Sequence, residues 1–226
     1  MPVITMASSK GGVGKTTSSL LLALELAQAG ASVALIDGDR NQPLSKWAAL
    51  DGKPHNVTVI SDTSEDTITQ TIEAAAAEYT FVIVDLEGSA NAMIIYAVSR
   101  SDLVVVPLQA SIVDAHQATR TIEAVRRIGH SSRQNVRAVL LMTKAPNFIS
   151  AEARHVQSDL EGAGFEFLPA VIHERVAYRS LFSYGGDLQS LPMKQVGNIE
   201  AARENAEVYA QSVLAVLREP KAKAVA

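Results

Sequence analysis

The chain has 226 residues, of which 47% are hydrophobic and 19% charged, and it carries a formal net charge of −4 and no cysteine. This composition is typical of a soluble globular protein with one sizeable core and excludes a disordered chain. The absence of cysteine excludes disulfides, thiolate metal sites and thiol nucleophiles, and no apolar run approaches the roughly 18 residues needed to span a bilayer. Together these features predict a cytoplasmic protein.

The charges are unevenly distributed along the chain. Residues 1–112 carry 6 Lys/Arg against 12 Asp/Glu, whereas residues 113–226 carry 14 against 12. The second half could therefore supply a phosphate-binding face, although ordinary solvated helix faces explain the same counts equally well.

Short β-branched runs alternate with helical stretches from the first residues to the last. Strands are predicted at Val3–Ala7, Ser32–Ile36, Val57–Ile60, Phe81–Val84, Leu103–Pro107, Arg137–Met142 and Glu166–Ile172. The helices predicted between and after them are Thr16–Ala29, Ser64–Glu78, Ala90–Val98, Ile112–Ile128, Ala151–Glu161 and Ile199–Arg218. Glycines at 30, 129 and 162 are expected to close three of these helices.

Alternating strands and helices predict an α/β fold with a doubly wound, mostly parallel sheet flanked by helices. Several strands are apolar almost throughout, as expected where helices cover both faces of a parallel sheet. No internal repeat or long linker interrupts the pattern. We expect a single domain over residues 1–218 and a flexible C-terminal tail over residues 219–226.

A glycine-rich turn lies between the first strand and the first helix, with the sequence Ser9-Lys10-Gly11-Gly12-Val13-Gly14-Lys15-Thr16-Thr17. The glycines allow the backbone to curl so that successive N–H groups point at phosphate oxygens, and the following helix adds its positive dipole end. Lys15 is expected to reach the β- and γ-phosphates and Thr16 to place its hydroxyl on Mg²⁺. Strand, loop and helix agree, so the sequence predicts a P-loop nucleotide site.

One departure from the general P-loop is informative, because Ser9 stands where its first glycine would be and Lys10 precedes Gly11. This arrangement resembles the deviant Walker A motif, Lys-Gly-Gly-x-Gly-Lys-Thr, of the ParA/MinD family of partitioning and positioning ATPases. In that family the first lysine reaches across a dimer interface to the nucleotide of the partner subunit. The resemblance therefore implies the same part for Lys10 and an ATP-dependent homodimer.

Two acids, Asp37 and Asp39, follow the second predicted strand, and acids at the carboxyl end of a parallel strand lie beside the ligand crevice of an open α/β sheet. The segment is similar to the Asp-x-Asp-Pro-Gln switch of the family. The resemblance implies that Asp39 positions the attacking water and that Asp37 helps to arrange the groups around the metal. Asn41 and Gln42 both remain candidates for the polar residue of the family motif.

A second acid motif follows the strand Phe81–Val84, where Asp85 is expected to hold Mg²⁺ through a water as a Walker B acid does. The sequence Asp85-Leu86-Glu87-Gly88 has the Asp-x-x-Gly spacing by which many GTPases place a glycine N–H on the γ-phosphate. Gly88 is expected to do this here. Glu87 faces either the water or solvent.

The base is expected to lie between the ends of two late strands. Thr143 follows the first of these strands, and Ile172 lies in the segment that resembles the loop packing on adenine in the family. No Asn-Lys-x-Asp guanine motif is present, which favours ATP over GTP. The five histidines have no metal-ligand spacing, and neither a Gly-x-Ser-x-Gly elbow nor a dinucleotide-binding glycine pattern occurs.

The resemblance covers nearly the whole chain and implies a slow ATPase that acts as a switch. ATP would close two subunits into a sandwich that binds duplex DNA without sequence preference, placing it on the nucleoid, and a ParB-like or other partner would stimulate hydrolysis. Such a protein partitions or positions a plasmid, a chromosome region or a protein cluster. The candidate phosphate contacts in the more basic half are Arg175, Arg179, Lys194 and Arg203, each of which is at least as well explained as a solvated charge.

Three other functions stay open. One is a conjugative-transfer accessory that recruits a relaxosome, and another is a MinD-like regulator at a membrane. The segment Arg218–Lys223 is interrupted by Pro220 and lacks an apolar face, so we expect no membrane binding. The last is a metabolic enzyme on the same scaffold, of which an iron–sulfur type is excluded by the missing cysteines and a dethiobiotin-synthase-like type is disfavoured by Lys10.

Overall fold

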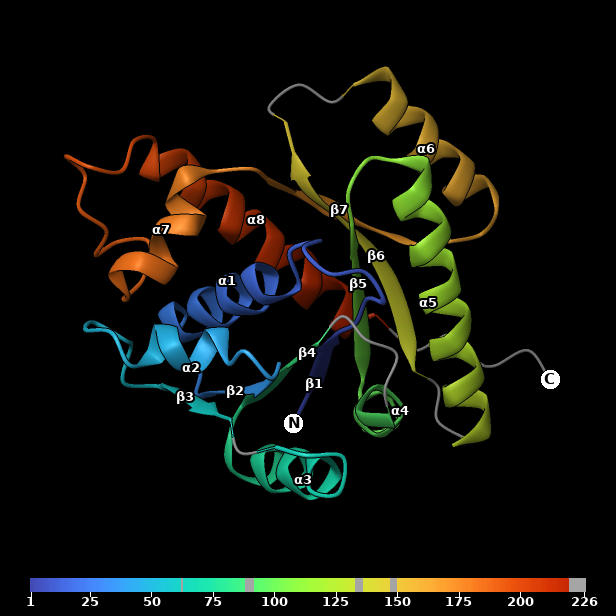
Figure 1. Cartoon of the computed structure of the whole chain (residues 1–226), viewed down its shortest axis with the longest axis horizontal. Coiled ribbons are helices and arrows are strands. Elements are labelled where there is room, and N and C mark those ends of the chain that lie inside the picture. Colours follow the sequence, from blue (N-terminus) through green and yellow to red (C-terminus); the bar gives the residue numbers. More distant parts are fainter. Residues whose placement is uncertain (62, 88–91, 133–135, 147–149, 220–226) are drawn as a thin grey trace.

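Seven parallel strands form one sheet at the centre of the computed structural model, which describes residues 1–61, 63–87, 92–132, 136–146 and 150–219 (Figure 1). The strand order across the sheet is β3-β2-β4-β1-β5-β6-β7. The strands are β1 (Val3–Met6), β2 (Val33–Gly38), β3 (Val57–Ile60), β4 (Phe81–Leu86), β5 (Leu103–Leu108), β6 (Arg137–Ala145) and β7 (Phe167–His173).

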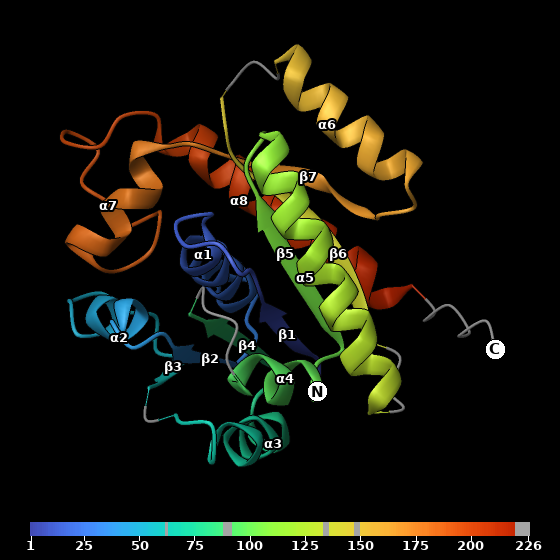
Figure 2. The same ribbon diagram turned by 45° about the vertical axis from the view of Figure 1, so that its right-hand side comes forward.

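Helices cover both faces of this sheet (Figure 2). One face carries α1 (Lys15–Gln28), α2 (Pro43–Ala48), α7 (Val176–Tyr184) and α8 (Ile199–Arg218), which share one apolar cluster. The other face carries α3 (Ile68–Glu78), α4 (Ala92–Val98), α5 (Ile112–Ser131) and α6 (Ala151–Gly162), packed in two further clusters. Burial of both faces explains why the strands are apolar along nearly their whole length.

Helix α1 is deeply buried, because it lies between the sheet and α8. Its residues Leu20, Leu21 and Leu22 are fully buried although they follow one another directly in the sequence. A helix that is apolar on all sides is stable only when protein surrounds it. The core therefore fixes the helix whose N-terminus forms the end of the glycine-rich loop.

The predicted fold class is confirmed, and all seven predicted strands and six predicted helices are present, β3 and α8 with the predicted bounds and the others with shifted ends. The helix predicted to begin at Ser64 begins at Ile68. Helices α2 and α7 were not predicted. Helix α2 has only six residues, too few to show a helical period, and α7 begins after Arg175, whose side chain does not cap the helix.

Two of the three glycines expected to close helices do not do so. Gly30 follows the last residues of α1 at φ +90°, as predicted. Gly129 lies buried inside α5, which continues to Ser131, so that prediction was wrong. Gly162 is the last residue of α6, and Gly164, at φ +82°, takes the left-handed conformation instead. The domain boundary at residue 218 stays a prediction, because residues 220–226 of the expected tail lie outside the described residues.

Candidate functional site

The glycine-rich loop connects the carboxyl end of β1 to the first turn of α1. Gly12 and Gly14 have φ values of +75° and +95°, a conformation that glycine adopts without strain. A Cβ at Gly11 or Gly12 would meet nothing within 4 Å, so one side of the loop is open. The loop therefore offers backbone N–H groups and a helix N-terminus to an anion, as a phosphate cradle requires.

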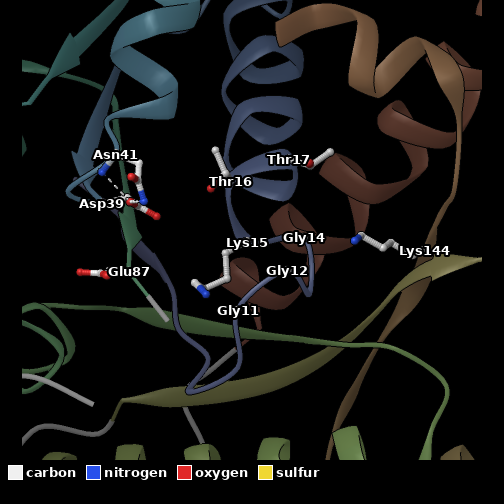
Figure 3. A pocket seen from close by; sticks show the side chains of 10 residues that line it. All are labelled: Gly11, Gly12, Gly14, Lys15, Thr16, Thr17, Asp39, Asn41, Glu87 and Lys144. Atoms are coloured by element: carbon white, nitrogen blue, oxygen red, sulfur yellow. Dashed lines mark hydrogen bonds between the residues drawn. The ribbon is translucent and has the colours of Figure 1, made fainter. Parts of the chain in front are cut away.

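Lys15 is the first residue of α1, and its side chain lies between the loop and the acids Asp39 and Glu87 (Figure 3). Only 7% of the residue is exposed, and its Nζ donates a hydrogen bond of 3.2 Å to the carbonyl oxygen of Lys10. Burial lowers the pKa of Lys15, while the negative charges of Asp85, Asp39 and Glu87 oppose this shift. A buried ammonium beside open loop amides is well placed for a polyanion.

Two acids lie side by side at the carboxyl ends of neighbouring strands, since Asp37 of β2 is paired in register with Asp85 of β4. Both are buried, with exposures of 1% and 0%. The Oδ2 of Asp37 accepts hydrogen bonds of 2.9 and 3.1 Å from the backbone N and the Oγ of Ser45. The Oδ1 of Asp85 accepts one of 3.2 Å from Ser19, and Thr16 also donates to this carboxylate.

The pair leaves Asp37 Oδ1 and Asp85 Oδ2 buried without a hydrogen-bond partner. Burial raises the pKa of Asp85 to about 7, helped by the charge of Asp37 and opposed by Thr16, Lys15 and Ser19. Burial also raises the pKa of Asp37. Buried acceptors with no donor fit a cation that approaches from the loop, so the residues present fit Mg²⁺.

The number of acids also fits this ion. The described residues contain no group of three or more His, Cys, Asp or Glu side chains that could hold a metal by themselves. Magnesium in phosphate-transfer sites is typically held by one or two carboxylates together with substrate phosphates and waters. Thr16, Asp37 and Asp85, the three residues predicted for the metal, lie together at one end of the loop.

Asp39 lies beyond the end of β2 and lines a pocket beside the glycine-rich loop. Its Oδ1 accepts hydrogen bonds from the backbone N and the Nδ2 of Asn41, at 2.8 and 3.1 Å. Asn41 lines the pocket, whereas Gln42 precedes α2 at φ +48° and does not line it. Glu87 lines the pocket on the same side as Asp39, and its Oε2 lies 3.6 Å from the Nε of Arg40 (Figure 3). The structure thus favours Asn41 as the polar partner of Asp39, and Gly88 lies outside the described residues.

The ammonium group of Lys10 forms an ion pair with Asp114 in the first turn of α5. The lysine side chain is 40% exposed and the aspartate side chain 2% exposed. The pair joins the phosphate loop to a helix on the opposite face of the sheet.

Two cavities lie beside the loop. The first, of about 580 Å³, is lined by Gly11, Gly12, Gly14, Lys15, Thr16, Thr17, Asp39, Asn41, Glu87 and Lys144. The second, of about 200 Å³, shares Gly14, Thr17 and Lys144 with the first and extends to Ile172. Thr143 of β6 lines the second cavity, and its hydroxyl lies 2.6 Å from the carbonyl oxygen of Val13 in the loop and 3.0 Å from that of Leu108. The residues predicted for phosphate and for base therefore line two neighbouring cavities that share three residues.

The four residues predicted to contact DNA lie in different surroundings. Arg175 lines the second cavity, and Arg179 lines it too and forms an ion pair of 2.7 Å with Glu174. Arg203 lies 3.4 Å from Glu200 in a depression that is also lined by Glu25, Glu204 and Glu207. Lys194 is exposed. The structure does not bring these four residues together into one basic face.

Sequence reasoning missed the residues that hold the site residues in place. Ser45 contacts Asp37, and Asp114 contacts Lys10. Nothing in the sequence around these residues signals either pair. Ser19 could have been found, because it lies three residues after Thr16 and a helix places such residues on one face.

The fold and the site together define a P-loop nucleotide-binding protein with an additional loop lysine, of the ParA/MinD class. The chain belongs to the VirC1 protein family, whose model matches residues 1–217. It is 37% identical over 220 residues to Protein ParA of Rhizobium radiobacter, covering 97% of this chain and 99% of that protein. It is also 28% identical over 180 residues to Maintenance of carboxysome distribution protein A of Halothiobacillus neapolitanus, covering 78% and 82% of the two chains.

Solved structures share the fold at low sequence identity. Apo McdA of Cyanothece superposes with a TM-score of 0.76 at 16% identity, covering 94% of this chain and 99% of that one. A plasmid partition protein of Borrelia burgdorferi bound to AMPPNP gives 0.70 at 17%, covering 95% and 99%. MinD of Pyrococcus horikoshii complexed with Mg-ADP gives 0.71 at 17%, covering 98% and 99%. Two of these three structures, the plasmid partition protein and MinD, carry a nucleotide on the same fold.

None of the helices in the described ranges has the length and apolar character needed to cross a membrane.

Proposed function

We propose that this chain is an ATPase that uses bound Mg²⁺-ATP to dimerise, binds duplex DNA without sequence preference in that state, and positions a cargo in the cell. The observation that carries the proposal is the first cavity, which the open loop, Lys15 and Thr16 line, together with two buried acids whose unpaired oxygens lie at the ends of the neighbouring strands β2 and β4. Mg²⁺-ATP would supply anionic phosphate oxygens to the loop and a cation to the acids.

Each residue then has a defined part. The amides of residues 11–14 and the ammonium of Lys15 bind phosphate oxygens, and Thr16, Asp37 and Asp85 hold Mg²⁺. Bound Mg²⁺ would neutralise charge on the β- and γ-phosphates. Asp39, kept in one orientation by Asn41, positions the attacking water. Because Asp39 is partly exposed and a single carboxylate orients the water, we propose slow turnover without a partner.

Dimerisation is supported by the surface around Lys10. Next to its partner Asp114, the helix exposes Ile112 and Val113, which are 60% and 64% exposed. A second copy of the chain would cover these apolar side chains and bring its own Lys10 toward the nucleotide. Release of Lys10 from Asp114 would thereby become coupled to the presence of ATP.

The positioning role is supported by relatives. The names of two similar proteins are Protein ParA and Maintenance of carboxysome distribution protein A, and one neighbouring structure is a plasmid partition protein. We propose that ATP-bound dimers lie on the nucleoid and that a ParB-like or other partner stimulates hydrolysis and release. Among the predicted DNA contacts, Lys194 is exposed and forms no ion pair with another described residue.

One experiment tests both parts of this proposal. Calorimetric titration of the protein with Mg²⁺ and ATP should give saturable heat, and random duplex DNA should bind only with ATP and weaken as salt rises. A Lys15→Ala protein serves as the control that cannot hold nucleotide. Absence of heat in the first titration rejects the nucleotide proposal, whereas an ATP-bound dimer that ignores DNA rejects only the DNA part.

A further inference from the structure

An exposed arginine, Arg40, stands in the segment that resembles the Asp-x-Asp-Pro-Gln switch, at the position of its proline. The backbone here forms a turn, in which the N–H of Gln42 donates a hydrogen bond of 2.9 Å to the carbonyl oxygen of Asp39. Asp39 Oδ1 fixes the turn further by accepting two hydrogen bonds from Asn41. Proline suits the second position of such a turn because its φ is fixed, and arginine lacks that property. The geometry of the turn therefore does not account for Arg40.

The side chain of Arg40 forms an ion pair with an acid of another loop. Its Nε lies 3.6 Å from the Oε2 of Glu87, which follows the last residue of β4. The arginine side chain is 88% exposed, whereas the glutamate side chain is 30% exposed and lines the first cavity. Because β2 and β4 are adjacent in the sheet, the pair joins the loops that follow two neighbouring strands.

The charges that line the first cavity are evenly balanced. Lys15 and Lys144 are its two cations, and Asp39 and Glu87 are its two acids, so the lining carries no net charge. Burial lowers the pKa of Lys15, and the charge of Glu87 is one of three that oppose this shift. Glu87 therefore acts on the lysine proposed to bind phosphate, and its own charge repels a triphosphate unless a cation offsets it.

Arg40 supplies that cation from outside the cavity. A guanidinium stays charged at every pH at which the protein would work. Exposed ion pairs contribute little to stability, so the pair is poorly explained as a support of the fold. The Glu87 carboxylate, however, is partly buried, and its charge is screened less by water and salt than that of a fully exposed acid.

We propose that Arg40 is a positioning residue for nucleotide binding, which holds the Glu87 carboxylate in an ion pair and offsets its charge so that the first cavity accepts a polyanion. Arg40 acts through Glu87 and does not itself contact phosphate. Because the guanidinium occupies the Glu87 carboxylate, Asp39 is left as the acid that orients water. The inference rests on the proposed nucleotide function.

A double-variant cycle tests the pair. Calorimetry at low salt gives dissociation constants for Mg²⁺-ATP and for Mg²⁺-tripolyphosphate, which has no base. Arg40→Met should weaken both ligands about fivefold, because the Glu87 charge is no longer offset. Glu87→Gln should bind both more tightly than the wild type. The double variant Arg40→Met/Glu87→Gln should return to within about twofold of the wild type, since the charge that Arg40 offset is absent.

Two further measurements separate charge from structure. Arg40→Lys keeps the positive charge and should restore most of the affinity, and at about 0.5 M salt the defect of Arg40→Met should shrink below about twofold. The matched control is Arg100→Met, which breaks an ion pair with Glu73 outside both cavities and changes the net charge equally. It should leave both affinities within about twofold of the wild type, because distant surface charges are screened.

Other outcomes overturn the inference. Wild-type affinity in Arg40→Met at low salt would refute it. A loss that persists in the double variant would place Arg40 on the phosphates or in the shape of the turn, and a loss confined to ATP would assign it to the base. An equal loss in Arg100→Met would reduce the effect to net charge. Failure of the wild type to bind ATP would reject the proposed function together with the inference, whereas the other results leave that function standing.

Discussion

Lys10 and Asp114 lie 104 residues apart in the sequence and form an ion pair within one protomer. The carboxylate is nearly buried and belongs to the first turn of α5, whereas the lysine belongs to the phosphate loop. A lysine held in this way has to leave its own carboxylate before it can reach a second subunit. If the proposed dimer uses Lys10 in this way, breaking the pair is a cost of dimerisation.

Neutralising Asp114 should make dimerisation easier. With Asp39→Ala added to both proteins to prevent turnover, Asp114→Asn should lower the ATP-dependent dimer dissociation constant by roughly fivefold, since a partly exposed ion pair contributes up to about 1 kcal/mol. Sedimentation equilibrium measures this constant. Glu123→Gln, an exposed acid on the same helix, is the control. Weaker dimerisation in Asp114→Asn would show that the pair supports the dimer instead.

Lys10→Ala should keep nucleotide binding and lose ATP-driven dimerisation, because the loop amides and Lys15 remain while the cation meant for the partner's nucleotide is gone. Calorimetry and sedimentation of the same preparation measure the two properties. A Lys10→Ala protein that still dimerises with ATP would refute the role of this lysine.

Removing Lys15 should abolish nucleotide binding. Its buried ammonium is the cation closest to the loop, so Lys15→Ala is expected to weaken Mg²⁺-ATP by roughly a hundredfold or more, beyond detection in a titration. Lys46→Ala, which removes an exposed lysine of α2 outside both cavities, should bind normally. Comparable affinities in the two variants would mean that the triphosphate lies elsewhere.

Asp39→Ala should trap the ATP-bound dimer. Loss of the carboxylate that orients water slows hydrolysis, while the metal-binding acids Asp37 and Asp85 are untouched. Phosphate release should fall at least about tenfold, and the dimer should persist through gel filtration with ATP. Rapid turnover in this variant would transfer the role to another acid, and Glu87, which lines the same cavity, would be tested next.

Glu25 makes stability depend on pH. Burial raises its pKa to about 7, and Glu207 and Asp187 add to this shift while Arg203 opposes it. An acid whose pKa is raised in the folded state binds more protons there than when unfolded, so stability falls as pH rises from about 4.5 to about 7. Glu25→Gln should therefore raise the melting temperature at pH 8 and leave it nearly unchanged at pH 4.5. Equal effects at both values, or a larger effect of Glu204→Gln on the same surface, would contradict the assignment.

Gly185→Ala should destabilise the fold. Gly185 ends α7 at φ +75°, and an added Cβ would lie 2.5 Å from the carbonyl oxygen of Asp51 and 2.6 Å from the Cβ of Leu50. Strain and overpacking together should cost about 2–4 kcal/mol of unfolding free energy, measured by urea denaturation. Gly197→Ala, where nothing lies within 4 Å of the added Cβ, should cost far less. Similar losses at both positions would argue against the close contact.

The local sequence was sufficient for the order of the seven strands, for six of the eight helices and for the phosphate loop. Alternation of apolar strands with helical stretches follows from burial of both sheet faces, and the loop requires glycines and a lysine at fixed spacing within nine residues. Asp37 and Asp85 could also be predicted, because a strand that ends in an acid places it at the ligand edge whatever its neighbours are. These features depend on residues close together in the chain.

Tertiary structure decided the features that depend on distant residues. It placed Asp37 beside Asp85, gave Lys10 a partner in α5, and directed Arg175 into the second cavity instead of toward solvent. The sequence does not tell whether a charged side chain is solvated, paired with an opposite charge or facing a ligand. Its role is set by burial and by the nearest opposite charge, and both arise only when segments far apart in the chain pack together.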